Sequence, residues 1–160
     1  ARIYAELVGY GSNTDGMHVT QPNRDTMAGC MRLSLADANL QADAIHYING
    51  HGTATEQGDI AESQATMEVM GTNIPISSLK GYFGHTLGAC GAIEAMLAIT
   101  MMQQQTFIAN LNLDQVDTAC APLNYIQGQA QHLQAAYIMS NNFAFGGINT
   151  SLIFRNVQTH

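Results

Sequence analysis

Apolar residues follow two different periods along the chain, and the two periods alternate. Runs rich in β-branched and aromatic residues predict strands at residues 3–9, 44–48, 75–79, 136–140 and 150–155. Apolar residues at three- and four-residue spacing predict helices at residues 27–38, 59–70 and 88–104. This alternation is typical of one α/β domain over residues 1–160, in which helices cover a mixed sheet.

The segments between the predicted strands and helices contain residues typical of loops and helix ends. Residues 11–24 are rich in Gly, Asn, Asp and Thr, so this segment is predicted to be a loop. Asn39 and Gly71 stand where the first two helices are expected to end. The chain begins at Ala1 and enters a strand at once, so we expect it to be cut from a longer polypeptide.

The stretch from Gly88 to Met102 is almost continuously apolar. Only Glu94 and Thr100 are clearly polar within it, and it is too short to span a bilayer. We therefore expect a buried helix and no membrane partner. If part of its cover is missing, the isolated chain is expected to expose an apolar face and to self-associate.

Composition and charge narrow the possible partners. A hydrophobic fraction of 46% is enough for a core, which argues against disorder. The chain has 5 Lys and Arg against 12 Asp and Glu, a formal charge of −7, with no basic cluster along the sequence. Nucleic acid and anionic membranes are therefore not expected as partners.

The cysteines indicate a compartment but no metal. Cys30, Cys90 and Cys120 are an odd number without a C-x-x-C pair, which favours the reducing cytosol over a secreted, disulfide-linked domain. No H-x-x-x-H or similar ligand spacing is present, so we expect no metal site.

Three loops dense in glycine and polar residues follow predicted strands: Asn49–Asp59, Lys80–Gly91 and Asn141–Asn149. Open α/β sheets assemble their sites beyond the ends of strands. Glycines flank His51 and His85, so the backbone there can bend sharply and another group can approach closely. These two histidines are therefore the candidate functional residues. Four others lack this setting and are expected to be surface or packing residues: His18, His46, His132 and His160.

In this order and spacing, the three loops resemble the histidine, lysine–histidine and glycine-rich motifs of the β-ketoacyl-acyl carrier protein synthases. The resemblance spans nearly the whole chain and corresponds to the C-terminal half of a thiolase-like fold, βαβαβαββ. It implies decarboxylative Claisen condensation in fatty acid or polyketide synthesis, in a homodimer or heterodimer. Substrates would be carried on the phosphopantetheine of acyl carrier protein, with no other cofactor. The family's nucleophilic cysteine belongs to the N-terminal half, which we expect this chain to lack, so that it is inactive alone.

By resemblance, His51 and His85 are the hydrogen-bond donors to the malonyl thioester carbonyl. Lys80 and Glu94 match the family's lysine and buried carboxylate, which would orient the histidines. Residue chemistry supports a pairing of these two, because a carboxylate in an apolar helix needs a partner and Lys80 is the only lysine in the chain.

The resemblance also assigns the rim of the site. Thr53 and Thr55 match hydroxyls that bind the pantetheine arm, and Phe145 matches a gating residue whose backbone N–H lines the acyl oxyanion hole. As alternatives, the threonines could be turn or helix-capping residues, and Phe143 and Phe145 could be core side chains.

The sequence departs from the family pattern at three positions. Gly50 precedes the first histidine, where a small or hydroxyl residue is common, and this changes little. Cys90 stands where alanine is common, and it can be read as a small packed hydrophobe. Ala144 replaces a glycine between the two phenylalanines, and its β-carbon is expected to stiffen the gate.

Other features of the sequence suggest different interpretations. Residues 117–120 resemble the segment that ends in the family's nucleophile, but Cys120 leads into an extended run instead of a helix, so we reject it as the nucleophile. A noncatalytic partner subunit that sets chain length, like a chain length factor, stays open, although both histidines are kept. An interaction module is a third possibility.

Overall fold

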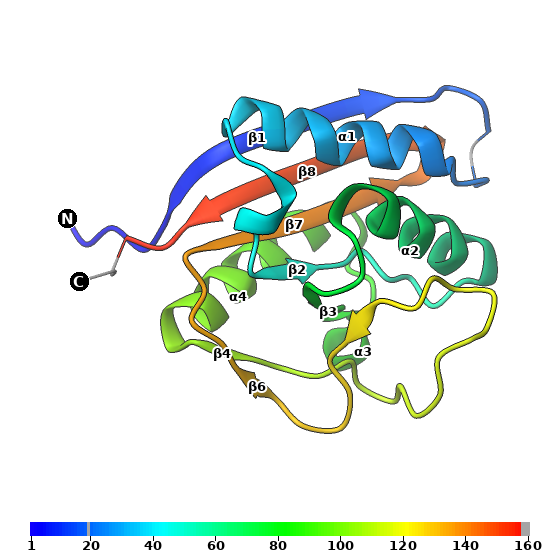
Figure 1. Ribbon diagram of the computed structural model, residues 1–160. Helices are drawn as coiled ribbons and strands as arrows, with labels where there is room; N and C mark the ends of the chain where they lie inside the picture. The colour runs from blue at the N-terminus through cyan, green and yellow to red at the C-terminus, as the bar shows by residue number, and fades with distance from the viewer. Residues whose placement is uncertain (19, 158–160) are drawn as a thin grey trace.

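The computed structural model describes residues 1–18 and 20–157, and its centre is a six-stranded sheet (Figure 1). The strand order is β1-β8-β7-β2-β3-β5, and β4 and β6 form a separate two-stranded ribbon. The strands are β1 (Glu6–Thr14), β2 (Tyr47–Asn49), β3 (Pro75–Ser77), β4 (Thr106–Phe107), β5 (Asn124–Tyr125), β6 (Gln131–His132), β7 (Tyr137–Ala144) and β8 (Ile148–Arg155). The α-helices are α1 (Arg24–Asp37), α2 (Glu56–Met70), α3 (Lys80–Phe83) and α4 (Cys90–Gln104), and short 3₁₀ turns span Ala42–Ala44, Leu87–Ala89 and Phe145–Gly147.

The sheet is mixed, as predicted. Strands β7, β2, β3 and β5 are parallel, whereas β8 runs antiparallel to both β1 and β7. The carboxyl ends of β2, β3 and β7 therefore meet at the same edge of the sheet. All three glycine-rich loops predicted from the sequence begin at or near these ends, so the topology brings them together.

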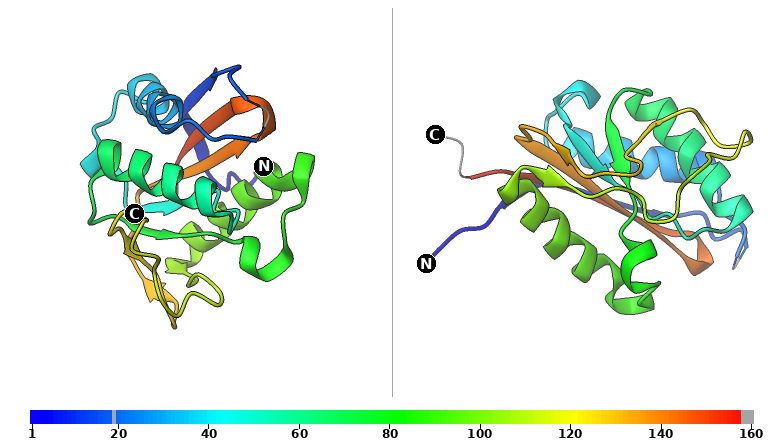
Figure 2. Two further views of the ribbon diagram at one scale, coloured as in Figure 1. Left: turned by 90° about the vertical axis from the view of Figure 1, so that its right-hand side faces the viewer. Right: turned by 90° about the horizontal axis from the view of Figure 1, so that it is seen from below.

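Helices cover both faces of the sheet. Figure 2 shows α1 and α2 on one face and α4 on the other. Met31, Ile48 and Met139 lie in the first core, with α1 and α2, and Tyr47 and Met102 lie in the second, with α4. Because central strands have helices on both sides, their short sequences are apolar or fully buried throughout.

The first strand is longer than predicted. The loop expected at residues 11–24 is wrong in its first part, because β1 continues to Thr14 and pairs with β8 along its whole length. Glycines inside the strand obscured this pattern. A β-carbon on Gly9 would lie 2.4 Å from the Ser34 carbonyl oxygen, and one on Gly11 would lie 2.3 Å from that of Cys30. Helix α1 packs so closely on β1 that only glycine fits.

The third loop also differs from its prediction. Strand β7 runs through Asn141 and Asn142 to Ala144, where the sequence suggested that the strand ended at residue 140. The asparagines belong to the ladder because they pair with Ser151 and Thr150 of β8. Polar side chains in this half of the strand face the site and the sheet interior, which hid the strand pattern.

Helix α4 is buried on one face only, so the prediction of a buried helix is correct for that face and wrong for the opposite one. Glu94, Ala98 and Met102 are fully covered, whereas Met96 on another face is 59% exposed. An apolar helix with an uncovered face agrees with the expected self-association of the isolated chain, which stays a prediction. A monomer in sedimentation velocity, together with no binding of a hydrophobic dye, would contradict it.

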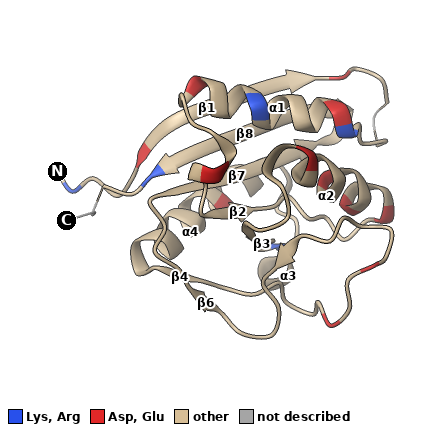
Figure 3. Ribbon diagram, in the orientation of Figure 1, with Lys and Arg blue, Asp and Glu red and all other residues tan. Residues whose placement is uncertain are grey.

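Charges are spread thinly over the surface. Figure 3 shows two basic segments on α1 and others near the N-terminus and at the end of β8, and acidic segments on β1, α1, α2 and the loops. Within residues 1–18 and 20–157, no helix has the length and apolar character that crossing a membrane requires. His18 and His132 are exposed and His46 is half-buried, as expected for residues outside the site, and His160 lies outside the described residues.

Candidate active site

The three loops line one cavity of about 640 Å³ at the carboxyl edge of the sheet. Five of the seven predicted site residues lie on its wall, namely His51, Thr53, Thr55, His85 and Phe145. The other two, Lys80 and Glu94, lie behind the wall with side chains that are 5% and 0% exposed. The site therefore has an outer layer that faces the cavity and an inner layer that supports it.

The two histidines come from different connections and meet at the cavity. His51 follows β2 and is buried, whereas His85 follows α3 and is exposed. Their ring centroids are 5.2 Å apart and the rings stand edge to face at 89°. Gly52 and Gly84 beside them have φ angles of +49° and +77°, a left-handed conformation that other residues rarely adopt. The glycines framing the histidines thus make the turns that bring the rings together.

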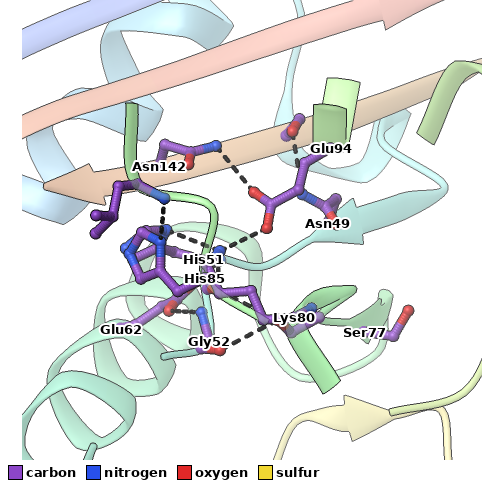
Figure 4. A network of polar contacts seen from close by, with 12 residues as sticks. Asn49, His51, Gly52, Glu62, Ser77, Lys80, His85, Glu94 and Asn142 are labelled. Atoms are coloured by element: carbon purple, nitrogen blue, oxygen red, sulfur yellow. Dashed lines mark hydrogen bonds and ion pairs between the residues drawn. The ribbon is translucent and has the colours of Figure 1, made fainter. Parts of the chain in front are cut away.

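Lys80 joins the first histidine to the buried carboxylate. Its Nζ lies 3.1 Å from His51 Nδ1 and 2.5 Å from Glu94 Oε1, and it also donates to the His51 carbonyl oxygen at 2.5 Å (Figure 4). Asn142 Nδ2 donates to the other Glu94 oxygen at 3.2 Å. The predicted pairing of Lys80 with Glu94 is confirmed, and the pair is fully enclosed.

These contacts fix the protons of both imidazoles. An ammonium group can only donate, so His51 Nδ1 accepts from Lys80 and the ring proton of neutral His51 resides on Nε2. His85 Nδ1 accepts from the Leu87 backbone N–H at 3.0 Å, so the His85 proton also resides on Nε2. Burial, followed by the charges of Lys80 and His85, lowers the pKa of His51 to about 3. His51 is therefore neutral at physiological pH with its ring proton on Nε2, and a side-chain hydrogen bond with Asn142 acts against the lowering of its pKa.

Glu62, on α2, is a site residue that the sequence reading missed. Its carboxylate accepts the His51 N–H at 2.6 Å and the Gly52 N–H at 2.7 Å, which clamps the turn that carries the histidine. Burial raises its pKa to about 7. The available signal was an acidic residue beside Ala61 and Ala65, on the face of the predicted helix that the small residues mark as buried.

Cys90 lies closer to the chemistry than the sequence suggested. It is 2% exposed, as expected for a small packed residue. Its Sγ, a ring nitrogen of His51 and a carboxylate oxygen of Glu94 also lie within 4.8 Å of one another, a set of atoms that could hold a metal ion. The ligand spacings sought in the sequence did not reveal this cluster. The cysteine and the glutamate are one helical turn apart, and the histidine comes from another loop.

The threonines and the aromatic residues form the rim. Thr53 and Thr55 line the cavity and their hydroxyls lie 2.9 Å apart. Thr55 occupies the N-cap position of α2, but its side chain makes no capping hydrogen bond, so capping alone does not explain it. Phe145 is 67% exposed, which excludes it from the core, whereas Phe143 is buried with its ring 6.2 Å from that of His51.

Ala144 adopts an ordinary conformation. Its φ of −90° and ψ of 165° are extended and open to any residue, so its β-carbon does not strain the loop in this state. The left-handed angles belong to Gly146 and Gly147 instead, at +80° and +70°. Any stiffening by Ala144 is therefore confined to loop conformations that need a positive φ at this position.

Cys120 is placed as predicted. It lies in the loop after β4, outside the residues that line the cavity, and strand β5 follows it instead of a helix. No helix N-terminus follows it, and burial raises its thiol pKa more than a hydrogen bond with Ser63 lowers it. Its surroundings thus agree with the prediction that Cys120 is not the nucleophile.

Comparisons with known proteins agree on one family. The family described as β-ketoacyl synthase, C-terminal domain, matches residues 4–114. The 3-oxoacyl-[acyl-carrier-protein] synthase 1 of Haemophilus influenzae is 38% identical over 156 residues, which cover 97% of this chain and 38% of that protein. A β-ketoacyl synthase from Burkholderia phymatum STM815 superposes with a TM-score of 0.98 at 61% identity, over 99% of this chain and 39% of that one. The ishigamide ketosynthase/chain length factor superposes with a TM-score of 0.93 at 34% identity, over 98% and 39%.

These matches cover about two fifths of the length of the relatives, always with nearly the whole of this chain. The loops that carry His51 and His85 fall inside the family match. The thiolase-like fold expected from the three motifs is confirmed, and the chain belongs to the β-ketoacyl synthase family as its C-terminal domain.

Proposed function

We propose that this chain supplies the histidine half of the active site of a 3-oxoacyl-acyl carrier protein synthase, an acyltransferase. The observation that carries the proposal is the pair of imidazoles at one cavity, each with Nδ1 occupied as an acceptor. Two N–H donors at one cavity suit an oxyanion that develops on a substrate between them.

The chemistry requires such donors at one step. When a malonyl thioester loses CO₂, the electron pair of the broken carbon–carbon bond becomes an enolate with its charge on the thioester oxygen. Nε2–H of His51 and of His85 would stabilise that oxygen, and because His51 is neutral it donates without adding a fixed charge. The enolate carbon then attacks the acyl group held as a thioester on the nucleophilic cysteine. A carbon–carbon bond forms, the carbon–sulfur bond breaks and the thiolate leaves.

Lys80, Glu94 and Glu62 act as positioning residues in this scheme. Lys80 holds Nδ1 of His51 as an acceptor, and Glu94 holds the ammonium in place through the buried ion pair. Glu62 holds the backbone of the same histidine. At the rim, Thr53 and Thr55 would bind the amides of the pantetheine arm, and the Phe145 backbone N–H would line the oxyanion hole for the acyl thioester, with its ring as the gate.

The other contributions to the reaction come from outside this chain. The nucleophilic cysteine would belong to the part of a full-length synthase that the matches leave uncovered, and the substrates would arrive on acyl carrier protein. The complete enzyme would work in the cytosol as a homodimer or heterodimer in fatty acid or polyketide synthesis, without a further cofactor. The 160-residue chain alone is expected to form no product.

A second candidate is supported by the match to a ketosynthase/chain length factor pair. In that case the domain would belong to a noncatalytic partner subunit that shapes the cavity and sets chain length. Two cavity-facing imidazoles with ordered tautomers favour the catalytic subunit, because a partner that only shapes a cavity has no oxyanion to stabilise.

Single-turnover assays on the complete synthase would test the proposal. His51→Ala and His85→Ala are each expected to slow malonyl decarboxylation and condensation roughly 10²- to 10³-fold, the usual effect of losing one oxyanion donor. His132→Ala, on exposed β6, is the matched control and is expected to keep the wild-type rate. A His51→Ala enzyme with full decarboxylation activity would contradict the donor role. A wild-type protein that forms product only with a second subunit carrying its own cysteine and histidines would favour the chain-length partner.

A further inference from the structure

Three side chains, His51 on the cavity wall and two residues of α4, present the donor atoms of a transition-metal site. A ring nitrogen of His51, Sγ of Cys90 and a carboxylate oxygen of Glu94 lie within 4.8 Å of one another. All three residues are less than 7% exposed. Imidazole nitrogen, thiolate sulfur and carboxylate oxygen are the three ligand types that zinc takes in proteins.

The same place already holds a positive charge. The Lys80 ammonium lies 3.1 Å from His51 Nδ1 and 2.5 Å from Glu94 Oε1. It also hydrogen-bonds Cys90, so all three donors face a cation. The surroundings are thus arranged to stabilise a cation against the cost of burial. Cys90 adds a sulfur donor, which an ammonium group uses poorly and a thiophilic metal ion uses well.

We propose that His51, Cys90 and Glu94 form a binding site for a thiophilic divalent cation, with Zn²⁺ as the probe, and that this ion competes with the Lys80 ammonium. Binding of the ion removes the Cys90 thiol proton, which goes to solvent, and displaces Lys80 from His51 Nδ1. Zinc–ligand distances of about 2.0–2.3 Å require donors about 3.3–3.8 Å apart in a tetrahedron, so the three side chains must close by about 1 Å. Three protein ligands leave a fourth position for water.

This site is separate in kind from the proposed condensation, because metal binding can be measured without substrate. If Zn²⁺ occupies it, Lys80 no longer orients His51, and a bound ion would switch the histidine pair off. Failure of the metal site would leave the proposed condensation untouched, and failure of the condensation would leave metal binding untouched.

Zinc binding to the complete synthase can be measured by competition with a chromophoric chelator. The wild type is expected to bind one equivalent that Cys90→Ala loses by roughly 100-fold or more in affinity, the scale on which metal sites respond to lost ligands or their supports. Cys120→Ala removes a cysteine outside the cluster and is the matched control, expected to bind as the wild type does. Lys80→Met removes the competing ammonium and is expected to tighten binding at least tenfold.

Cobalt supplies a readout that a merely structural role for Cys90 would not change. Co²⁺ added to the wild type should give a near-ultraviolet thiolate-to-metal charge-transfer band that is absent in Cys90→Ala and present in Cys120→Ala. Equal Zn²⁺ affinity in Cys90→Ala and wild type would overturn the proposal, even if Lys80→Met failed to fold. A charge-transfer band that survives in Cys90→Ala would overturn it as well, because the sulfur ligand would then lie elsewhere.

Discussion

The inner layer of the site, Lys80 and Glu94, differs from its rim, Thr53, Thr55 and Phe145, in burial and in the partners of its polar groups. In the inner layer, the Lys80 and Glu94 side chains are 5% and 0% exposed and each of their charged ends has a defined partner. At the rim, Phe145 is 67% exposed and Thr53 and Thr55 bond to each other. The buried charges fix where the proton of His51 resides, whereas the rim can change to suit a substrate without disturbing it.

The largest effect is expected from breaking the buried ion pair. Lys80→Met leaves the Glu94 carboxylate enclosed without its cation, and removal of one partner of a buried pair costs about 3–5 kcal/mol of unfolding free energy. Urea unfolding of the complete protein should show this loss. The double variant Lys80→Met/Glu94→Gln removes both charges at similar volume and is expected to recover most of it. Equal stabilities of the single and double variants would contradict the account of an enclosed pair.

The Glu62 carboxyl group that holds the His51 turn should make the stability of the protein depend on pH. Burial raises the Glu62 pKa from an ordinary 4.5 to about 7, so its contribution to stability is complete below pH 4.5 and is lost as the pH rises through 7. Glu62→Gln lacks this titration and should gain on the wild type by on the order of 3 kcal/mol between pH 4.5 and 8. Denaturant unfolding of both proteins across this range measures the difference.

The comparison of the two proteins is needed because His51 titrates in the opposite sense. Its pKa is lowered from 6.5 to about 3, so its contribution is present above pH 6.5 and is lost as the pH falls toward 3. Between pH 4.5 and 6.5 the two slopes oppose each other in the wild type. A wild-type-minus-variant difference that stays constant with pH would show that Glu62 does not titrate as described.

Substitution of Thr53 or Thr55 should weaken substrate binding while it changes the stability of the fold only slightly. Thr53→Ala and Thr55→Ala each remove one hydroxyl of a partly exposed pair, and the expected loss of stability is about 0.5–1.5 kcal/mol. In the complete synthase, KM for the carrier-bound substrate should rise several-fold while kcat changes little. A fall in kcat at unchanged KM would instead place these residues with the inner layer.

The smallest effect is expected at the gate. Ala144 has an extended backbone that glycine can also adopt, so Ala144→Gly should cost only about 0.4–1 kcal/mol, through the greater freedom of the unfolded chain. If alanine limits the motion of the loop, the variant should accept a wider range of acyl chain lengths, measured as the ratio of kcat/KM values for long and short acyl donors. An unchanged ratio would show that Ala144 does not limit the gate.

The sequence predicted the fold where one period dominated a segment. Residues 59–70 have helical spacing and a terminal Gly71, and α2 occupies them with that glycine at φ +73°. Prediction failed where tertiary packing set the residue type. Gly11 was predicted to lie in a loop because glycine is typical of loops. It is glycine in a strand because α1 lies directly over β1 and leaves no room for a side chain.

The candidate site also has residues that the sequence could reveal and residues that it could not. His51 and His85 could be found because they lie in glycine-rich loops that follow predicted strands, and sheet topology brings such loops together. Lys80 was assigned by its match to the family's lysine. Glu62 could not be found, because its role depends on the direction of a helix relative to a turn 11 residues earlier. The position of Cys90 beside His51 likewise depends on how α4 packs against the sheet, which one sequence does not specify.

The central claim is that both imidazoles are held with Nδ1 as acceptor and with the ring proton on Nε2, and the most direct test is ¹⁵N NMR of the histidine rings. In the complete synthase labelled at histidine, His51→Gln and His85→Gln would assign the two sets of signals. We expect both rings to carry their proton on Nε2, and we expect His51 to stay neutral down to pH 5 because its pKa is lowered to about 3. A His51 ring protonated on Nδ1, or one that titrates near pH 6.5, would contradict the account.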